Sequence, residues 1–238
     1  MVSKMTLPFE ELDRRVTAMG DLVLRRRVEP TLHLDVFEVK LGDEFLMSSL
    51  FTTSEVALAQ LGLAGVEDPE IDVVVGGLGL GYTAREVLAD ARVRSLHVVE
   101  ALEPVIDWHR RHLVPLGREL SADPRCSFVH GDFFALTTEG WLPAGPARCH
   151  AVLVDIDHSP RHVLHPTHAA FYSPAGLARL RDRLHPGGVF ALWSDAAPDD
   201  AFIAVASDVF SSCRAEVVSF DNPLTDGTAS ATVYVATA

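Results

Sequence analysis

The pattern of hydrophobic and polar positions changes near residue 70 of this chain. Before that point, apolar and polar residues approach alternation with a period of two, as in residues 32–37 (LHLDVF), which is typical of half-buried strands. After it, short apolar runs such as residues 72–75 (DVVV) alternate with helical patterns. This alternation predicts a mostly parallel sheet with helices on both faces, because parallel strands are joined by crossovers that cover the sheet.

The ranges of the expected elements define two parts. Strands are predicted over residues 21–28, 32–40 and 44–48, followed by a helix over residues 53–61. Later strands are predicted over residues 71–75, 95–99, 126–130, 151–155, 189–193, 215–220 and 231–236. Helices between them are predicted over residues 82–89, 103–112, 169–184 and 199–210. We therefore expect a small antiparallel β element at residues 1–50 and a Rossmann-like α/β domain with a seven-stranded sheet at residues 51–238.

The end of the chain refines this fold class. Asn-Pro and Asp-Gly pairs within residues 222–228 predict a hairpin turn that joins the last two strands. A final strand that runs antiparallel to the rest is typical of the S-adenosylmethionine-dependent methyltransferase fold.

Composition and charge exclude several classes of protein. The 238 residues are 48% hydrophobic and carry a formal net charge of −13, which disfavours binding to nucleic acid. We interpret the one tight basic run, residues 25–27, as a solvated strand end. The three cysteines form no CxxC pair, so we expect neither a metal site nor disulfides. No apolar stretch has membrane-spanning length and the first residues do not resemble a signal peptide, so we expect a cytoplasmic protein.

A glycine-rich turn follows the strand at residues 71–75. Gly76, Gly77, Gly79 and Gly81 allow a tight turn and close approach of a ligand, and the helix after them offers free N–H groups. A nicotinamide dinucleotide is the natural rival ligand, but the third glycine of its GxGxxG motif would come one residue early.

Acidic residues end the next two strands and narrow the choice of ligand. Glu100 can accept hydrogen bonds from both hydroxyls of a ribose. Asp132 can accept one from the amino group of an adenine, which Phe133 can flank, although Asp132 also fits a simple helix cap. Together with the glycine turn, these residues favour an adenosyl sulfonium over a dinucleotide.

The fourth strand of the main domain ends in candidate catalytic groups. Asp155, Asp157 and His158 follow it, at the edge where open α/β sheets place reacting groups. A carboxylate there can hold an amine substrate and take up its proton, while one of the two aspartates is expected to cap a turn. The later histidines of the segment, at positions 162, 165 and 168, do not have zinc-site spacing, so a proton-accepting histidine is favoured over a metal ligand.

Several segments of the chain, within residues 20–200, resemble the spermidine synthase family of aminopropyltransferases. The resemblance is carried by VVVGGLGLGYTAREVL, VVE, DPRCSFVHGDFF, AVLVDIDHSP and AAFYSPAGLARLRDRLHPGGVFALWSD. It implies that the N-terminal strands form part of an amine pocket and of a homodimer contact. It also implies a donor that is S-adenosylmethionine or its decarboxylated form, bound as a co-substrate without a metal.

The family's functional residues transfer only in part. Glu100 and Asp132 match the acids that bind ribose and adenine, and Asp155 matches the first acid of the family's DS(S/T)DP loop. The second loop aspartate, which deprotonates the attacking amine, is replaced by His158, and the donor-anchoring aspartate of the glycine motif is replaced by Gly79. Of a Tyr-His-Glu stretch, only Glu55 remains. The resemblance therefore implies an acceptor pocket with Glu55, Asp155 and Tyr172.

Three functions are compatible with these residues. The leading hypothesis is transfer of an aminopropyl or other alkyl group from an S-adenosylmethionine-type sulfonium to a small amine. The second is a small-molecule methyltransferase, which Gly79 favours because it removes an acid near the donor's tail. The third is a nucleoside-binding homologue that is not an enzyme, and a nicotinamide oxidoreductase is a distant fourth.

Overall fold

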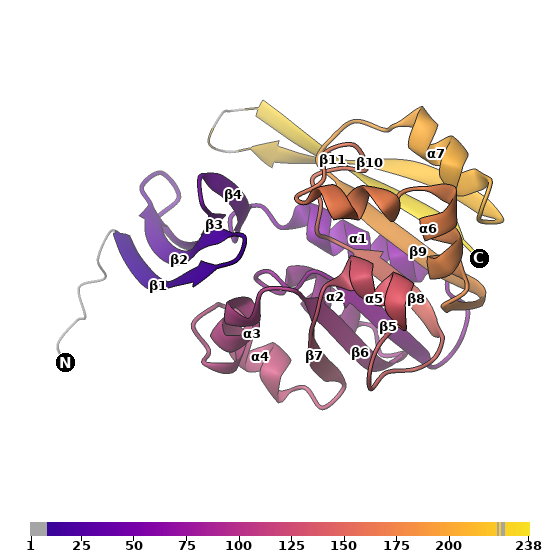
Figure 1. Ribbon diagram of the computed structural model, residues 1–238. Helices are drawn as coiled ribbons and strands as arrows, with labels where there is room; N and C mark the ends of the chain where they lie inside the picture. Colours follow the sequence, from indigo (N-terminus) through magenta and orange to yellow (C-terminus); the bar gives the residue numbers. More distant parts are fainter. Residues whose placement is uncertain (1–8, 223, 225–226) are drawn as a thin grey trace.

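Two β-sheets organise the protein (Figure 1). The computed structural model describes residues 9–222, 224 and 227–238. The smaller sheet is antiparallel and consists of β1 (Phe9–Thr17), β2 (Gly20–Glu29), β3 (Leu34–Leu41) and β4 (Glu44–Ser48). Helix α1 (Thr53–Ala64) follows and packs against the larger sheet. The division into domains at residues 1–50 and 51–238 stays a prediction.

The larger sheet has the strand order β10-β11-β9-β8-β5-β6-β7. Its strands are β5 (Ile71–Gly76), β6 (Val93–Glu100), β7 (Cys126–His130), β8 (Cys149–Val154), β9 (Leu184–Ser194), β10 (Ser212–Asn222) and β11 (Gly227–Thr237). Pairing is parallel from β9 through β8, β5 and β6 to β7, whereas β11 is antiparallel to both β9 and β10. The predicted fold class, a mostly parallel seven-stranded sheet with a small antiparallel β element, is confirmed.

Helices cover both faces of the larger sheet. They are α2 (Tyr82–Ala89), α3 (Glu103–Arg110), α4 (Gly117–Ala122), α5 (Phe133–Glu139), α6 (Pro174–Arg181) and α7 (Asp200–Ser207). Successive residues of β5 point into different cores: Val73 and Val75 pack with α1 to α4, and Val74 packs with α5 to α7. A strand buried on both faces has no polar side to alternate with, which explains its continuous apolar sequence.

The structure corrects several predicted elements. Strand β1 and helices α4 and α5 were not predicted. The helix expected over residues 169–184 is divided into a 3-10 helix, η1 (Pro166–Ala170), and α6. The reason for the break is Ser173, whose side chain caps Gly176 N–H and whose helical conformation is disfavoured by Pro174.

The expected hairpin near the end of the chain and the expected lack of a membrane-spanning segment can be compared with the fold. The predicted hairpin turn at residues 222–228 includes residues 223, 225 and 226, which lie outside the described part, but β10 and β11 pair antiparallel up to Asn222 and Gly227. Within the described ranges, no helix combines the length and the apolar character that crossing a membrane requires.

Candidate active site

The glycine turn lies between β5 and α2, where the sequence predicts it. Gly77, Gly79 and Gly81 have φ values of 95°, 46° and 92°, in the region that favours glycine. A Cβ atom at Gly77 would clash with the carbonyl oxygen of Asp155, so the turn also packs too closely for a side chain. The backbone therefore presents an uncovered surface at the start of α2.

Met47 of β4 takes part in this turn, which the sequence did not reveal. A Cβ atom at Gly79 would clash with the Met47 thioether. Met47 thus occupies the space beside the position where the resemblance to the spermidine synthase family would place an aspartate. The apolar side chain comes from the N-terminal sheet, about 30 residues away in sequence from the turn, so no local pattern connects the two.

Glu100 ends β6 and lies against the glycine turn. Its Oε2 accepts a hydrogen bond from Leu78 N–H at 3.0 Å and its Oε1 accepts one from Leu102 N–H at 2.8 Å. Burial raises the pKa of Glu100, and these backbone donors partly offset that effect. The carboxylate is held rigidly beside the turn, and each oxygen has a second lone pair for a ligand.

Asp132 has the helix-cap role, one of the two that the sequence left open. Its Oδ1 caps α5 by accepting hydrogen bonds from Phe134 N–H and Ala135 N–H, at 2.9 and 3.3 Å. The residue also lines the cavity described below, and the cap does not use Oδ2. Phe133 is buried over Gly76, where a Cβ atom would lie 2.9 Å from the phenylalanine ring.

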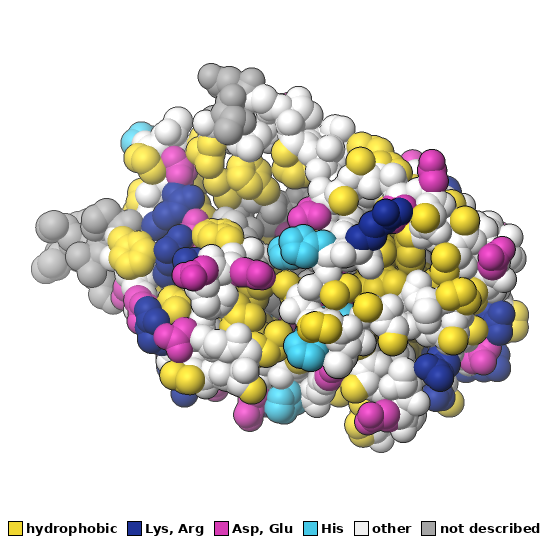
Figure 2. All heavy atoms as spheres, turned by 45° about the horizontal axis from the view of Figure 1, so that its top comes forward, with side chains coloured by type: hydrophobic (Ala, Val, Ile, Leu, Met, Phe, Trp, Pro, Cys, Tyr) yellow, Lys and Arg dark blue, Asp and Glu magenta, His cyan; other side chains and the backbone are white. Residues whose placement is uncertain are grey.

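A cavity of about 840 Å³ connects these groups with the N-terminal sheet. Its wall includes Gly77, Glu100, Asp132, Asp155, Glu55 and His158. Figure 2 shows hydrophobic, acidic and histidine side chains around a hollow in this face of the molecule. A volume of this size accommodates a nucleoside-sized ligand together with a small second molecule.

Two carboxyl groups, Glu55 and Asp155, lie in the cavity wall, close enough for the charge of Asp155 to act on Glu55. Glu55 lies in the first turn of α1 and accepts a hydrogen bond from Ser54 Oγ, while Asp155 follows β8 and accepts one from Thr83 Oγ1, both at 2.8 Å. Among the residues that the structure describes, no Lys, Arg or His side chain forms an ion pair with either acid.

The surroundings of the pair make ionisation costly. Desolvation and then the charge of Asp155 raise the pKa of Glu55 to about 7. Desolvation raises the pKa of Asp155 to about 6, against the hydrogen bond from Thr83. Because the two groups interact, they titrate as a pair around neutral pH. A bound cation would offset the cost of ionising these two carboxyl groups, so the site is suited to a positively charged ligand.

Asp157 and Tyr172 do not reach the cavity, which corrects their expected roles. Asp157 is fully buried and accepts hydrogen bonds from Leu164 N–H, the His168 ring and Tyr172 O–H, each at 2.8 Å. Tyr172 is buried behind the same wall. With all of these contacts made inside the protein, Asp157 holds the loop after β8 in place and does not line the cavity.

His158 does line the cavity. Its Nδ1 lies 3.5 Å from Asp195 Oδ2 and its Nε2 lies 3.9 Å from Glu44 Oε2, and its ring centre is 4.9 Å from that of His162. Of the three catalytic candidates in the sequence, the fold thus brings Asp155 and His158 into the cavity and leaves Asp157 outside it.

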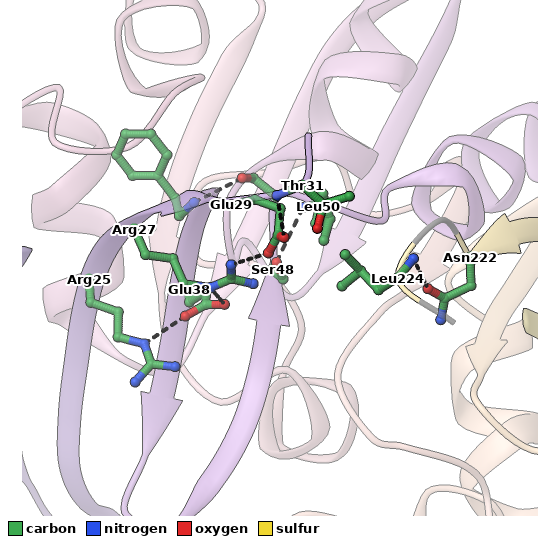
Figure 3. Close-up of polar contacts among 11 residues, drawn as sticks. Arg25, Arg27, Glu29, Thr31, Glu38, Ser48, Leu50, Asn222 and Leu224 are labelled. Carbon is green, nitrogen blue, oxygen red and sulfur yellow. Dashed lines mark hydrogen bonds and ion pairs between the residues drawn. The ribbon is translucent and has the colours of Figure 1, made fainter. Parts of the chain in front are cut away.

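The N-terminal sheet supplies a second charged part of the wall (Figure 3). Glu38 is 2% exposed and accepts hydrogen bonds from Arg25 Nε at 2.6 Å and from Arg27 Nε at 2.7 Å. Arg27 also pairs with Glu29. The interpretation of residues 25–27 as a solvated strand end is therefore wrong for Arg27, which lines the cavity. Their period-two spacing opposite Glu38 was the available signal, because it places both arginines on one face.

The histidine-rich segment holds no group of metal ligands. In the part of the chain that the structure describes, three or more His, Cys, Asp or Glu side chains nowhere come together as a metal site would require. His168 is nevertheless part of the cavity wall, a position that the sequence did not indicate.

Comparison with known proteins gives one consistent group of relatives. No family model matches the chain. Polyamine aminopropyltransferase 2 of Pseudomonas aeruginosa is 31% identical over 176 residues, covering 68% of this chain and 47% of that protein. Polyamine aminopropyltransferase of Prochlorococcus marinus is 27% identical over 180 residues, covering 71% of this chain and 54% of that protein. The chain thus matches about half the length of these curated relatives.

Solved structures show the same fold. Spermidine synthase from Thermotoga maritima superposes with a TM-score of 0.72 at 18% identity, covering 95% of this chain and 72% of that one. A spermidine synthase in complex with the transition-state analogue AdoDATO gives 0.71 at 17% identity, with the same coverage. At these identities the likeness establishes the fold and leaves the chemistry to the residues of the site.

Proposed function

Because this chain is related by sequence and by fold to the spermidine synthase family of polyamine aminopropyltransferases, we propose that it transfers an alkyl group to a small amine. The donor is a sulfonium of the S-adenosylmethionine type, with aminopropyl as the leading candidate for the transferred group. The homodimer that the resemblance implies and the cytoplasmic location expected from the sequence stay predictions.

One observation carries the proposal: Glu55 and Asp155 line the cavity beside the glycine turn without a cationic partner in the described residues. Desolvated carboxylates are costly unless a positive charge compensates them. An amine enters as an ammonium ion and supplies this charge. A nucleotide or other anion would meet repulsion at the same place.

The donor's adenosyl part fits the other end of the cavity. The backbone of Gly77 to Gly81 supports the nucleoside, Glu100 accepts hydrogen bonds from the ribose hydroxyls, and Asp132 faces the adenine with its free oxygen. The sulfonium then lies between this end and the acid pair. Its positive charge is a second source of compensation for Glu55 and Asp155.

The reaction needs an amine that has lost its proton. The nitrogen lone pair attacks the carbon next to sulfur, the C–S bond breaks, and its electron pair stays on sulfur as a neutral thioether. Asp155 and Glu55 hold the nitrogen in line, and positioning supplies much of the acceleration because the sulfonium is already a good leaving group. His158 stands at the position of the family's proton-accepting aspartate, and it takes the amine's proton.

Methyl transfer is the second candidate, and a specific observation favours it. Gly79 replaces the aspartate that anchors the donor's amino group in spermidine synthases, and Met47 fills the neighbouring space. This apolar replacement weakens selection for a decarboxylated donor. An intact S-adenosylmethionine carries a carboxylate that the N–H-rich turn tolerates.

Product analysis decides between these reactions. The purified chain is incubated with putrescine or related amines and with each donor in turn, and the nucleoside product is identified by chromatography. Methylthioadenosine from the decarboxylated donor is the expected result. S-adenosylhomocysteine from S-adenosylmethionine would instead establish methyl transfer. Neither product from any amine, despite calorimetric binding of a donor, would leave a nucleoside-binding protein without this activity.

A further inference from the structure

A buried hydrogen-bond network lies behind one wall of the cavity and holds His168. The centre of the network is Asp157, whose Oδ1 is 2.8 Å from His168 Nδ1 and whose Oδ2 accepts a hydrogen bond from Tyr172 O–H at 2.8 Å. Leu164 N–H donates a further hydrogen bond to Oδ1. A fully buried carboxylate with three such contacts is a fixed support, because it cannot exchange them for water.

This network determines which nitrogen of His168 carries a proton. Burial and the nearby Asp157 charge raise the pKa of Tyr172 well above its ordinary value, so its hydroxyl donates to Asp157. An Asp157 carboxylate that accepts every contact requires a hydrogen on His168 Nδ1. In the neutral ring, Nε2 is then a hydrogen-bond acceptor with a defined direction.

The nitrogen without a hydrogen belongs to a ring in the cavity wall. The His168 ring lines the cavity and stacks on Phe134, with the ring centres 4.0 Å apart and the planes at 29°. Phe134 follows Asp132 and Phe133, which flank the expected site of the adenine. Nε2 has no hydrogen-bond partner among the described residues. It is also not one of the fully buried side-chain atoms that lack a partner, so it is accessible from outside the protein.

We propose that His168 reads the nucleobase of the donor, with Nε2 accepting a hydrogen bond from the 6-amino group of adenine. This inference rests on the proposed function, because it assumes that the cavity binds an adenosyl compound. A 6-oxo purine would present an oxygen to the same lone pair, and the contact would become repulsive. The site should therefore prefer a 6-aminopurine nucleoside over its 6-oxo counterpart by about tenfold to a hundredfold.

The same contacts argue against His168 as the group that deprotonates the acceptor. Its ring packs on α5, whereas Asp155 is hydrogen-bonded to Thr83 at the start of α2. The residue is thus associated with the nucleoside end of the wall. Asp157 and Tyr172 act through His168 as positioning residues.

The test measures binding of 5′-methylthioadenosine and 5′-methylthioinosine by calorimetry. The wild-type chain should bind the adenosine compound about tenfold or more tightly. His168→Phe keeps a ring to stack on Phe134 but has no acceptor, so the preference should disappear while thermal unfolding shows a folded protein. His168→Gln restores an acceptor without the ring, and part of the preference should return.

Two further variants separate His168 from its neighbours. Tyr172→Phe removes one support of Asp157 outside the cavity and should reduce the preference by a few-fold, through loss of positioning. It also serves as the test if His168→Phe does not fold. Asp132→Asn keeps a good helix cap and measures how much of the preference Asp132 contributes beside His168.

The outcomes distinguish the two proposals. An adenosine preference that survives His168→Phe, or that is reversed in the wild type, would overturn the role of His168 and leave the proposed function intact. A wild-type chain that binds neither nucleoside, nor either donor, would overturn the proposed function and the inference with it.

Discussion

Two pairs of carboxylates stand in or beside the wall of one cavity, and their surroundings are opposite. Glu29 and Glu38, on the N-terminal sheet, are satisfied by arginines, and Arg27 holds the pKa of Glu29 below its ordinary value. Glu55 and Asp155, beside the larger sheet, each accept a hydrogen bond from one hydroxyl and have no cationic partner among the described residues, and the pKa of Glu55 is raised to about 7. The first pair is a completed structural network, whereas the second gains its compensating charge only when a ligand binds.

This contrast shows that one part of a cavity wall can be held by ion pairs while another part can bind a cation. The ion pairs fix β2 against β3, so the N-terminal sheet keeps its shape without a ligand. The acid pair stores an unfavourable interaction beside the glycine turn, and a cation relieves it. Each of the following changes tests one side of the comparison.

The largest effect is expected from removing a charge of the unpaired acids. Asp155→Asn keeps the size of the side chain but removes half of the cation site, so turnover should fall by about a hundredfold or more. The measurement is product formation at saturating donor. Asp72→Asn is the matched control. Asp72 lies at the start of β5, whereas the glycine turn follows the end of that strand, and Asp72 is paired with Arg94.

The control should lose stability and keep its turnover per folded molecule. Equal losses in the two variants would mean that Asp155 acts through the fold alone, and the distinction between paired and unpaired acids would fail.

A loss of stability is expected from the paired acids. Glu38→Gln leaves Arg25 and Arg27 without their shared carboxylate, and the free energy of unfolding should fall by about 2 to 3 kcal/mol. The value lies below that for a fully buried pair because the arginine side chains remain 26% and 27% exposed. Urea denaturation followed by circular dichroism measures it, with Asp155→Asn as the comparison that should not lose stability at pH 8.

A smaller effect is expected in the pH dependence of stability. The folded-state pKa values of Asp155 and Glu55, about 6 and about 7, lie above their ordinary values of 3.8 and 4.5. Between these limits the folded state holds more protons than the unfolded state, so stability falls as pH rises from about 4 to about 7 and then stays constant. The pair should contribute about 1 to 2 kcal/mol to this fall, reduced because both groups keep a face toward the cavity.

The difference between the wild type and Asp155→Asn isolates this contribution from that of other groups. The variant should gain stability relative to the wild type as pH rises through that range. A difference that does not change with pH would show that the two acids are ordinary surface carboxylates.

Much of the cavity wall beside the glycine turn follows from local sequence. An apolar run and a helical pattern indicate strand β5 and the helix after it. Glycine at positions 77, 79 and 81 fits the left-handed backbone conformation of the turn. Glu100 and Asp132 follow because carboxyl ends of neighbouring parallel strands meet at one edge. These features depend on residues close together in the chain, so periodicity and turn chemistry are sufficient to find them.

The arrangement of the cavity wall around Asp155 and His158 was decided by tertiary structure. The loop after β8 follows no strand period, so the sequence could not tell that Asp155 and His158 face the cavity while Asp157 points into the protein. Met47 beside Gly79, Arg27 in the cavity wall and His168 stacked on Phe134 come from segments far apart in the chain. The sequence by itself determined which chemical groups are available and which ones follow a strand. Their partners depend on packing between distant elements, and those partners decide which carboxylate is neutralised and which remains free for a ligand.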